Sequence, residues 1–218
     1  MERTALVRCL RYAAPAFVAL VLSACGQSST GAITPSTSPT SPVASSPSSG
    51  SPLPSQQPVP AESNPPGDIP DNTVYVTFRS SGGHFAVKVP EGWARATHPA
   101  KVSFASALNS ITLAWTAMSS APTVASAKSV DVPALRSTQL AFQLQSVKQV
   151  HLSGGTAIEI VYQVNSKPNA VTGKQYRLVI ERFELFKNGQ EDVLSLSSPV
   201  GADNVDPWRI VSESFRWA

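Results

Sequence analysis

The sequence predicts an α+β fold, in which an antiparallel sheet has helices packed on it. From Asp71 onward, apolar and polar residues alternate over many short segments, which is the period of half-buried strands. Short turns containing glycine or asparagine separate most of these segments, which favours hairpins. Only two segments have helical spacing, one between strands and one at the C-terminal end. Hairpin-linked strands with few helices are typical of the α+β class.

The first expected hairpin comes directly after residue 71. Residues 74–79 alternate, residues 80–83 supply Ser-Ser-Gly-Gly as a turn, and residues 85–89 alternate again until Pro90. Glu91-Gly92-Trp93 then predicts a second turn that returns the tryptophan to the core.

A second strand pair and a helix follow. Residues 102–104 and 111–115 predict the two strands. Residues 131–144 predict a helix, with Asp131 as the N-cap and Pro133 in the first turn. The inward face of this helix is expected to carry Val132, Leu135 and Phe142.

Two more hairpins are expected after this helix. Residues 147–152 and 158–164 flank a Gly-Gly turn, and residues 174–187 and 191–197 flank Asn188-Gly189, the strongest hairpin turn signal. Within residues 174–187 the apolar positions change from even to odd numbers. We therefore expect a β-bulge near Glu181.

The chain is expected to end in a helix from about Asp203 or Asp206. Asp206-Pro207 fits an N-cap followed by proline at the first helical position. Trp208, Val211 and Phe215 would then face the core. The total is about eight strands and two helices.

The first 24 residues have the pattern of a secretory signal. Arg3, Arg8 and Arg11 precede an apolar run over residues 13–24, which at about 12 residues is too short to span a bilayer. Leu22-Ser23-Ala24-Cys25-Gly26 resembles the lipobox of bacterial lipoproteins. That resemblance implies cleavage before Cys25, lipid attachment to its thiol, and a location outside the cytoplasm at the cell membrane.

Residues 25–70 are expected to form a disordered tether. Eleven of the 19 prolines lie between Pro35 and Pro70, and apolar residues are few, so the segment cannot offset its ordering entropy. The expected organisation is therefore residues 1–24 as signal peptide, residues 25–70 as lipidated cysteine and linker, and residues 71–218 as one α+β domain.

From the net charge and the distribution of charged residues, we do not expect the protein to bind nucleic acid. The full chain has a net charge of +3, but the first 24 residues carry three arginines against one glutamate, so the mature chain is close to +1. Lysine and arginine alternate with acidic residues in the domain and form no run that would follow a phosphate backbone.

Three motifs resemble the Mog1/PsbP-like fold and, within it, the LpqN-type actinobacterial lipoproteins. They are the Phe85–Trp93 segment FAVKVPEGW, the Leu152–Ala157 segment LSGGTA and the Ile210–Phe215 segment IVSESF. The resemblance implies an α/β/α sandwich and a binding or assembly accessory without catalytic activity. It transfers no functional residue, because the matching positions are structural.

We find no catalytic, cofactor or metal motif in the sequence. His84, His98 and His151 lack metal-ligand spacing, and His98 is expected in a loop. No Gly-x-Ser-x-Gly elbow is present, and Gly154-Gly155 lacks the lysine and further glycines of a phosphate loop. Cys25 is the only cysteine of the mature chain, so no internal disulfide is expected.

Three functions remain open at this level. The first is a membrane-anchored, non-catalytic binding module at the cell envelope that captures a protein, a glycan or a lipidic ligand. The alternatives are an envelope hydrolase with an unrecognised site and a structural lipoprotein that spaces the wall. An exposed patch or cleft would favour the first, and a pocket with convergent polar groups of shifted pKa would favour the second.

Overall fold

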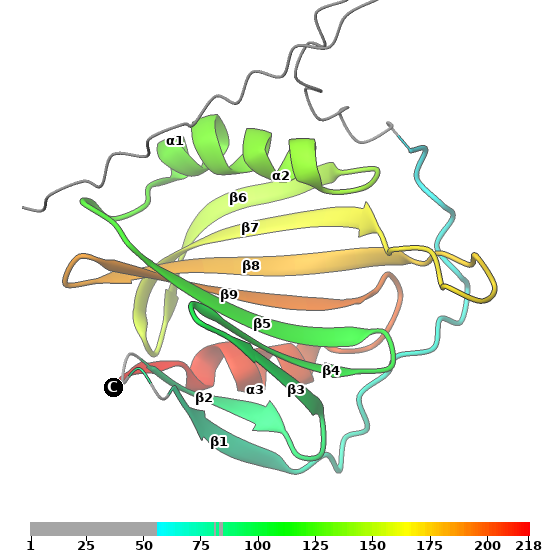
Figure 1. Cartoon of the computed structure of the whole chain (residues 1–218), viewed down its shortest axis with the longest axis horizontal. Coiled ribbons are helices and arrows are strands. Elements are labelled where there is room, and N and C mark those ends of the chain that lie inside the picture. The colour runs from blue at the N-terminus through cyan, green and yellow to red at the C-terminus, as the bar shows by residue number, and fades with distance from the viewer. Residues whose placement is uncertain (1–55, 81, 83–84) are drawn as a thin grey trace, which may run out of the picture. The chain divides into compact units, whose positions relative to one another are not determined.

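The computed structural model describes residues 56–80, 82 and 85–218. The predictions for the signal peptide, for Cys25 and for the linker as far as residue 55 lie outside these residues, as does His84. The described chain forms antiparallel strands with helices against them (Figure 1).

The strands of the described residues form two sheets. The large sheet has seven strands in the order β3-β4-β5-β9-β8-β7-β6: β3 (Ala94–His98), β4 (Lys101–Ser106), β5 (Asn109–Ala117), β9 (Gln190–Pro199), β8 (Arg177–Lys187), β7 (Gly155–Asn165) and β6 (Gln143–Leu152). The small sheet has three strands in the order β1-β2-β10: β1 (Tyr75–Arg79), β2 (Phe85–Pro90) and β10 (Arg216–Trp217). All pairings are antiparallel, as the hairpin signals predicted.

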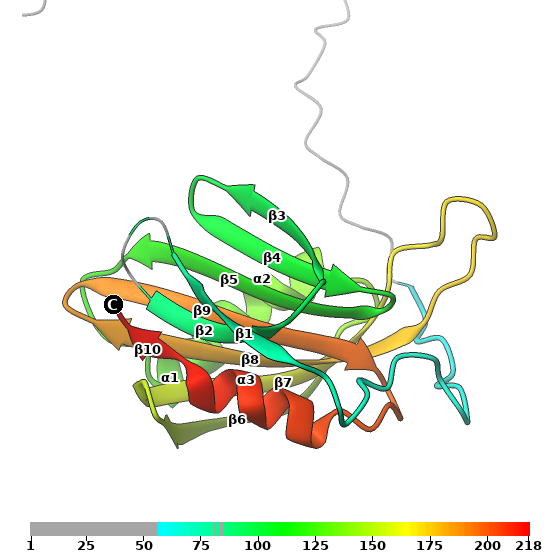
Figure 2. The same ribbon diagram turned by 90° about the horizontal axis from the view of Figure 1, so that it is seen from below.

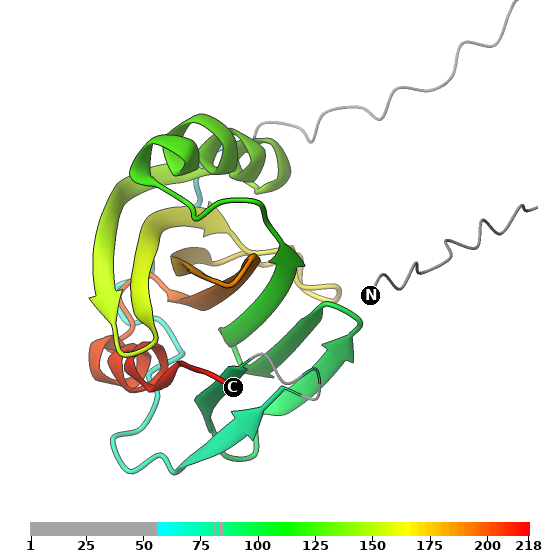
Figure 3. The ribbon, with the colours of Figure 1, turned by 90° about the vertical axis from the view of Figure 1, so that its left-hand side faces the viewer.

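Helices lie on both faces of the large sheet. One face carries a continuous helical segment made of α1 (Val124–Ser126), the π-helical turn η1 (Ala127–Asp131) and α2 (Val132–Thr138). The other face carries α3 (Val205–Ser214) together with the small sheet (Figures 2 and 3). This arrangement confirms the expected α+β class and the α/β/α layering.

Each face has its own hydrophobic cluster. The cluster against α3 and the small sheet, called the large core, joins Phe85, Phe215 and Trp208 to sheet residues such as Leu185 and Leu194. The cluster against α1–α2, called the small core, joins Ala127 and Val132 to sheet residues such as Ile160 and Ile180.

The two cores explain the parity change in β8 and show that the predicted bulge at Glu181 is wrong. Pairing of β8 with both neighbours runs in unbroken register. Ile180 belongs to the small core and Phe183 to the large core, so the apolar positions change face while the strand stays regular. The register shift found in the large sheet lies elsewhere, between Leu144 and Ser146 of β6.

The first helical segment begins earlier and ends earlier than predicted. Its N-cap is Thr123, which shares a capping box with Ser126, whereas Asp131 lies inside the helical run and caps nothing. The helix ends at Thr138, so Phe142 follows it, although the ring is still buried in the small core. The C-terminal helix likewise begins at Val205 after Asn204, which places Pro207 in the first turn and not at the first position.

Strand β3 was not predicted. Its sequence, ARATH, has no large apolar residue and all five side chains are exposed, so no hydrophobic alternation marks it. Pairing with β4 alone defines this strand, and it places His98 in a strand rather than in a loop.

Residues 56–70, called the strap, lie against the domain, so the expected disorder up to residue 70 does not hold for this part. Asn165 binds the strap backbone twice: its Oδ1 accepts from Val59 N at 3.0 Å, and its Nδ2 donates to the Gln57 carbonyl at 2.9 Å. The domain therefore extends in contact back to residue 56.

The C-terminal half of the strap is held by a second asparagine. Asn204, which is buried, accepts from Ile69 N at 2.8 Å and donates to the Gly67 carbonyl at 2.9 Å. Ile69 itself is buried in the large core, and Lys174 pairs with Glu62 at 2.6 Å. Side-chain amides can satisfy an extended backbone that has no strand partner.

Candidate functional site

A broad concavity lies on the α2 face of the large sheet. It has a volume of about 630 Å³ and is called the sheet groove. Because α1–α2 covers β6, β7 and part of β8, the face of β9 and β5 beyond them is left open. The lining includes hydroxyl-bearing side chains on the floor, apolar side chains on the wall and the guanidinium of Arg182. Gln139, Asn165 and Lys167 also line it.

The floor is a two-by-two array of hydroxyls. Ser110 pairs directly with Ser197, and Thr112 pairs directly with Ser195, across β5 and β9. Neighbouring strands lie about 4.8 Å apart, so the four hydroxyls are regularly spaced. Within the described residues these four side chains make no hydrogen bond to another protein group and are half-buried. They are therefore free to bind polar groups of a ligand.

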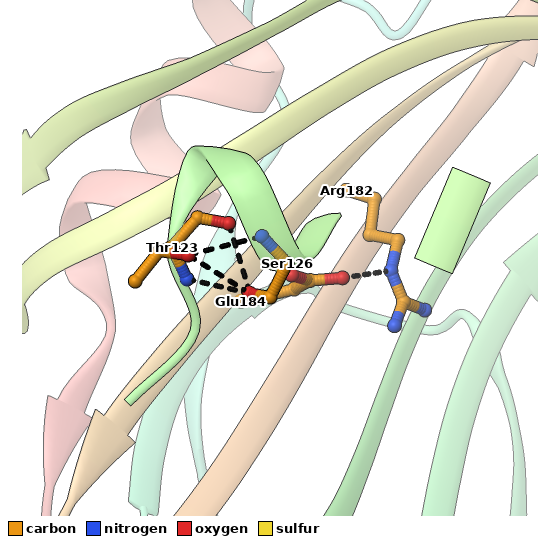
Figure 4. Close-up of polar contacts among 4 residues, drawn as sticks. All are labelled: Thr123, Ser126, Arg182 and Glu184. Atoms are coloured by element: carbon orange, nitrogen blue, oxygen red, sulfur yellow. Dashed lines mark hydrogen bonds and ion pairs between the residues drawn. The ribbon is translucent and has the colours of Figure 1, made fainter. Parts of the chain in front are cut away.

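Strand pairing places Arg182 beside this array. Arg182 lies opposite Ser195 on β9, and Ile180 lies opposite Ser197. The Arg182 Nε bonds to Glu184 Oε1 at 2.8 Å, as drawn in Figure 4. The two terminal amino groups of Arg182 bind no other described residue, so they can donate to a ligand oxygen.

Glu184 holds Arg182 from beneath the helix. Its side chain is fully buried near the start of α1, where Thr123 and Ser126 close the capping box (Figure 4). Desolvation raises the pKa of Glu184, the nearby charge of Arg182 opposes that rise, and Asp131 adds to it. The pair orients the guanidinium while keeping the acid out of the groove.

The apolar wall comes from α2, the turn after it, and the ends of β7 and β8. Its members are Leu135, Leu140, Tyr162, Val164, Leu178 and Ile180. The Tyr162 ring is tilted by 32° against the Phe142 ring, with the centroids 5.2 Å apart, and burial raises the pKa of the Tyr162 phenol. The groove can therefore accept hydrocarbon along one side and hydroxyl or acidic groups along its floor.

A second, smaller concavity lies on the opposite face, between α3 and strands β6 to β8. It measures about 310 Å³ and includes Glu159, Glu181 and His151. Glu159 pairs with Lys148 at 2.8 Å, which supplies a partner for its otherwise buried carboxylate. Desolvation and the charge of Glu159 raise the pKa of Glu181. Ser212 also lines this concavity, and its hydroxyl donates to the Arg209 carbonyl at 3.4 Å.

The histidines considered from the sequence do not come together. His98 lies on β3 and His151 on β6, at opposite edges of the large sheet, and His151 Nδ1 contacts the Thr156 hydroxyl at 3.2 Å. The described residues contain no group of histidine, cysteine, aspartate and glutamate side chains suited to a metal. Cys25 lies outside the described residues, so its predicted lipidation stays a prediction.

No motif in the sequence marked the sheet groove. Ser110, Thr112, Ser195 and Ser197 look like ordinary solvent-facing positions of strands. Only the β5–β9 pairing, between segments far apart in the chain, brings them together.

No helix in the described part of the chain is long and apolar enough to cross a membrane. No protein-family model matches the sequence, and no curated protein matches it.

Several solved structures have a similar fold. The chain is similar to CyanoP, the cyanobacterial PsbP of Synechocystis sp. PCC 6803, with 12% identity over 71% of this chain and 100% of that one, at a TM-score of 0.49. The Saccharomyces cerevisiae Ran-binding protein Mog1p aligns with 12% identity over 66% and 96% of the two chains, at a TM-score of 0.45. Mycobacterium tuberculosis LpqN, described as involved in cell envelope biogenesis, aligns with 13% identity over 68% and 92%, at 0.43. An alignment with a Bacteroides thetaiotaomicron protein spans 48% of that protein's length. The expected Mog1/PsbP-like domain type is thus represented among these structures, and the likeness is one of fold.

Proposed function

We propose that this protein is a lipid-anchored, non-catalytic binding module of the cell envelope, and that its ligand occupies the sheet groove. The observation that carries the proposal is the groove itself. Four hydroxyls without a hydrogen-bond partner in the described part of the protein lie there beside an apolar wall. Arg182 lies next to them and uses only its Nε to bind Glu184. The lipobox-like sequence ending in Cys25 supports the location at a membrane.

The lining specifies the chemistry of the ligand. Serine and threonine hydroxyls both donate and accept, so they match a hydroxyl-rich group, and the free amino groups of Arg182 match an acidic or carbonyl oxygen. Leu135, Leu140 and Leu178 supply apolar contact on one side. The ligand class is therefore an amphiphilic envelope molecule with a polar, hydroxyl-bearing head and a hydrocarbon part.

The first test blocks the groove floor. A shortened chain that begins at residue 26, and so lacks Cys25, is incubated with a detergent extract of the native envelope. It is then re-isolated and analysed by native mass spectrometry. A co-purifying amphiphile is expected with the unmodified chain. Replacing Ser195 and Ser197 by leucine fills the floor and should abolish its retention.

The matched control changes two hydroxyls on strands outside the groove. Thr97 and Ser106 are exposed on β3 and β4 and do not line it, so T97L/S106L should retain the amphiphile. Arg182→Gln should weaken retention while leaving the apolar wall intact. Equal retention by the floor variant and the control would refute the proposed site.

A further inference from the structure

The outer face of the small sheet carries three exposed cations on three neighbouring strands. Ala86 on β2 pairs with Arg79 on β1 and also with Arg216 on β10, so the two arginines flank one small residue. Lys88 lies two residues along β2 and therefore on the same face. Together with the side of α3 they line a concavity of about 460 Å³, called the cationic groove.

No carboxylate of the described residues neutralises these three cations. The four ion pairs among all the described residues are Lys148–Glu159, Lys174–Glu62, Arg182–Glu184 and Arg209–Asp206, and none includes Arg79, Lys88 or Arg216. Arg216 Nη1 donates only to backbone carbonyls, those of Glu213 and Phe215. Like charges held this close repel one another, so an anionic partner would stabilise this surface.

The acid that lines the cationic groove is engaged elsewhere. Glu213 Oε2 accepts hydrogen bonds from the backbone N and the hydroxyl of Ser153, at 3.3 and 3.0 Å. These bonds hold the carboxylate toward the β6–β7 turn. The charged side chains of the lining are therefore three cations and one carboxylate, a net charge of +2.

Apolar side chains share the same surface. Ile210 on α3 is 40% exposed at the groove, and Trp217 lines it while its Nε1 donates to the Gly154 carbonyl at 3.0 Å. A soluble anion would use the cations but not this apolar rim. A membrane surface uses both, since tryptophan and apolar side chains favour the interface and arginine binds phosphate.

We propose that the cationic groove docks the domain onto a membrane surface containing anionic phospholipids. The lipid phosphates lie against Arg79, Lys88 and Arg216, while Ile210 contacts the interfacial layer. This surface is distinct from the sheet groove, which lies on the other side of the large sheet, so the two proposals stand or fall separately.

The expected strength follows from the charge. Each lysine or arginine near an anionic surface contributes about fivefold in partitioning, so three contribute about 100-fold. The effect acts over a Debye length of about 10 Å at 0.1 M salt and falls as ionic strength rises.

Vesicle flotation of the shortened chain that begins at residue 26 tests the proposal. This chain retains the strap and both cores but has no lipid of its own. It should float with vesicles containing 30% phosphatidylglycerol in phosphatidylcholine, and it should not float with phosphatidylcholine alone. Removing the charges with R79Q/K88Q/R216Q should lower partitioning at least tenfold, and R79Q/K88Q, which keeps the Arg216 contacts, should lower it by an intermediate amount.

The control variant K101Q/K128Q/K187Q removes the same number of charges from exposed lysines outside the cationic groove. It should float like the unmodified chain, and circular dichroism should show that all variants are folded. Equal losses in the two triple variants, or equal flotation on both kinds of vesicle, would overturn the proposal. Displacement of the chain from vesicles by millimolar inorganic phosphate at constant ionic strength would also overturn it, by showing a site for the free anion.

Discussion

The two faces of the large sheet are covered to different extents. Against α3 and the small sheet, the large core packs Phe85, Trp115, Phe215 and Trp217 ring against ring, with Phe85 and Phe215 stacked at 5.8 Å. On the α2 face, helical cover reaches β6, β7 and part of β8, and the open surface beyond it carries hydroxyls and Arg182. One sheet can therefore be closed by aromatic packing on one face and left partly open, with polar side chains, on the other.

The residues of a single strand show the same division. In β9, Leu194 and Leu196 point to the large core and are fully buried, while Ser195 and Ser197 point to the sheet groove. The alternation of side chains places these two roles one residue apart.

The largest expected effect comes from the large core. Phe215→Ala removes a fully buried ring and should lower the free energy of unfolding by about 3–5 kcal/mol, measured by urea denaturation. Phe142→Ala on the other face should lower the free energy of unfolding by a smaller amount, because that ring belongs to a smaller cluster that can relax. The difference between the two variants should be at least about 1 kcal/mol. Equal losses would contradict the difference between the faces.

A close backbone approach in the large core should produce the next effect. A Cβ at Gly154 would lie 2.5 Å from Phe215 Cδ1 and 3.1 Å from the Phe215 carbonyl oxygen. Gly154→Ala should therefore lower the free energy of unfolding by about 1–3 kcal/mol. Gly155→Ala is no control because its φ is +123°, but Ser153→Ala beside it should cost clearly less.

A pH effect is expected at Glu181, on the large-core face. Burial, and then the charge of Glu159, raise the pKa of its carboxyl above the ordinary 4.5. The folded form then keeps a proton that the unfolded chain releases, so this residue makes stability fall as pH rises from 4.5 through the folded-state pKa. Glu181→Gln removes this slope and should raise the free energy of unfolding at pH 7 by less than about 1 kcal/mol, since the group is partly solvated. Unfolding curves of the two proteins at pH 4.5 and pH 7 measure the difference, and an unchanged slope would contradict it.

The smallest effect on stability is expected in the sheet groove. Ser197→Ala removes a half-buried hydroxyl without a protein partner, so the free energy of unfolding should change by no more than about 0.5 kcal/mol. Retention of the amphiphile should nevertheless fall. A loss of stability above 1 kcal/mol would show that the hydroxyl belongs to the structure and not to the binding surface.

Local chemistry in the sequence determined most of the strands. Asn188-Gly189 adopts positive φ at both positions, 51° and 80°, as the hairpin between β8 and β9 requires. The apolar alternation before and after such turns identified the hairpins, and helical spacing identified Trp208 and Val211 of α3, and Phe215 at its C-cap, as core residues. These signals act over a few residues, so they can be read from the chain alone.

Only the tertiary structure decided which face each strand residue serves and where the sites lie. The parity change at Glu181 has two explanations in the sequence, a bulge or a second core, and only the presence of helices on both faces separates them. The strap is ordered by two asparagines more than 100 positions away along the chain, which its own composition cannot reveal.

Both proposed sites have the same origin. Ser110 meets Ser197, and Arg79 and Arg216 flank β2 from its two sides, because long-range pairing brings distant segments side by side. The motif that predicts export and a lipid anchor, in contrast, consists of contiguous residues ending at Cys25. Contiguous chemistry is encoded in sequence order, whereas a surface assembled from separate strands exists only after the strands have paired.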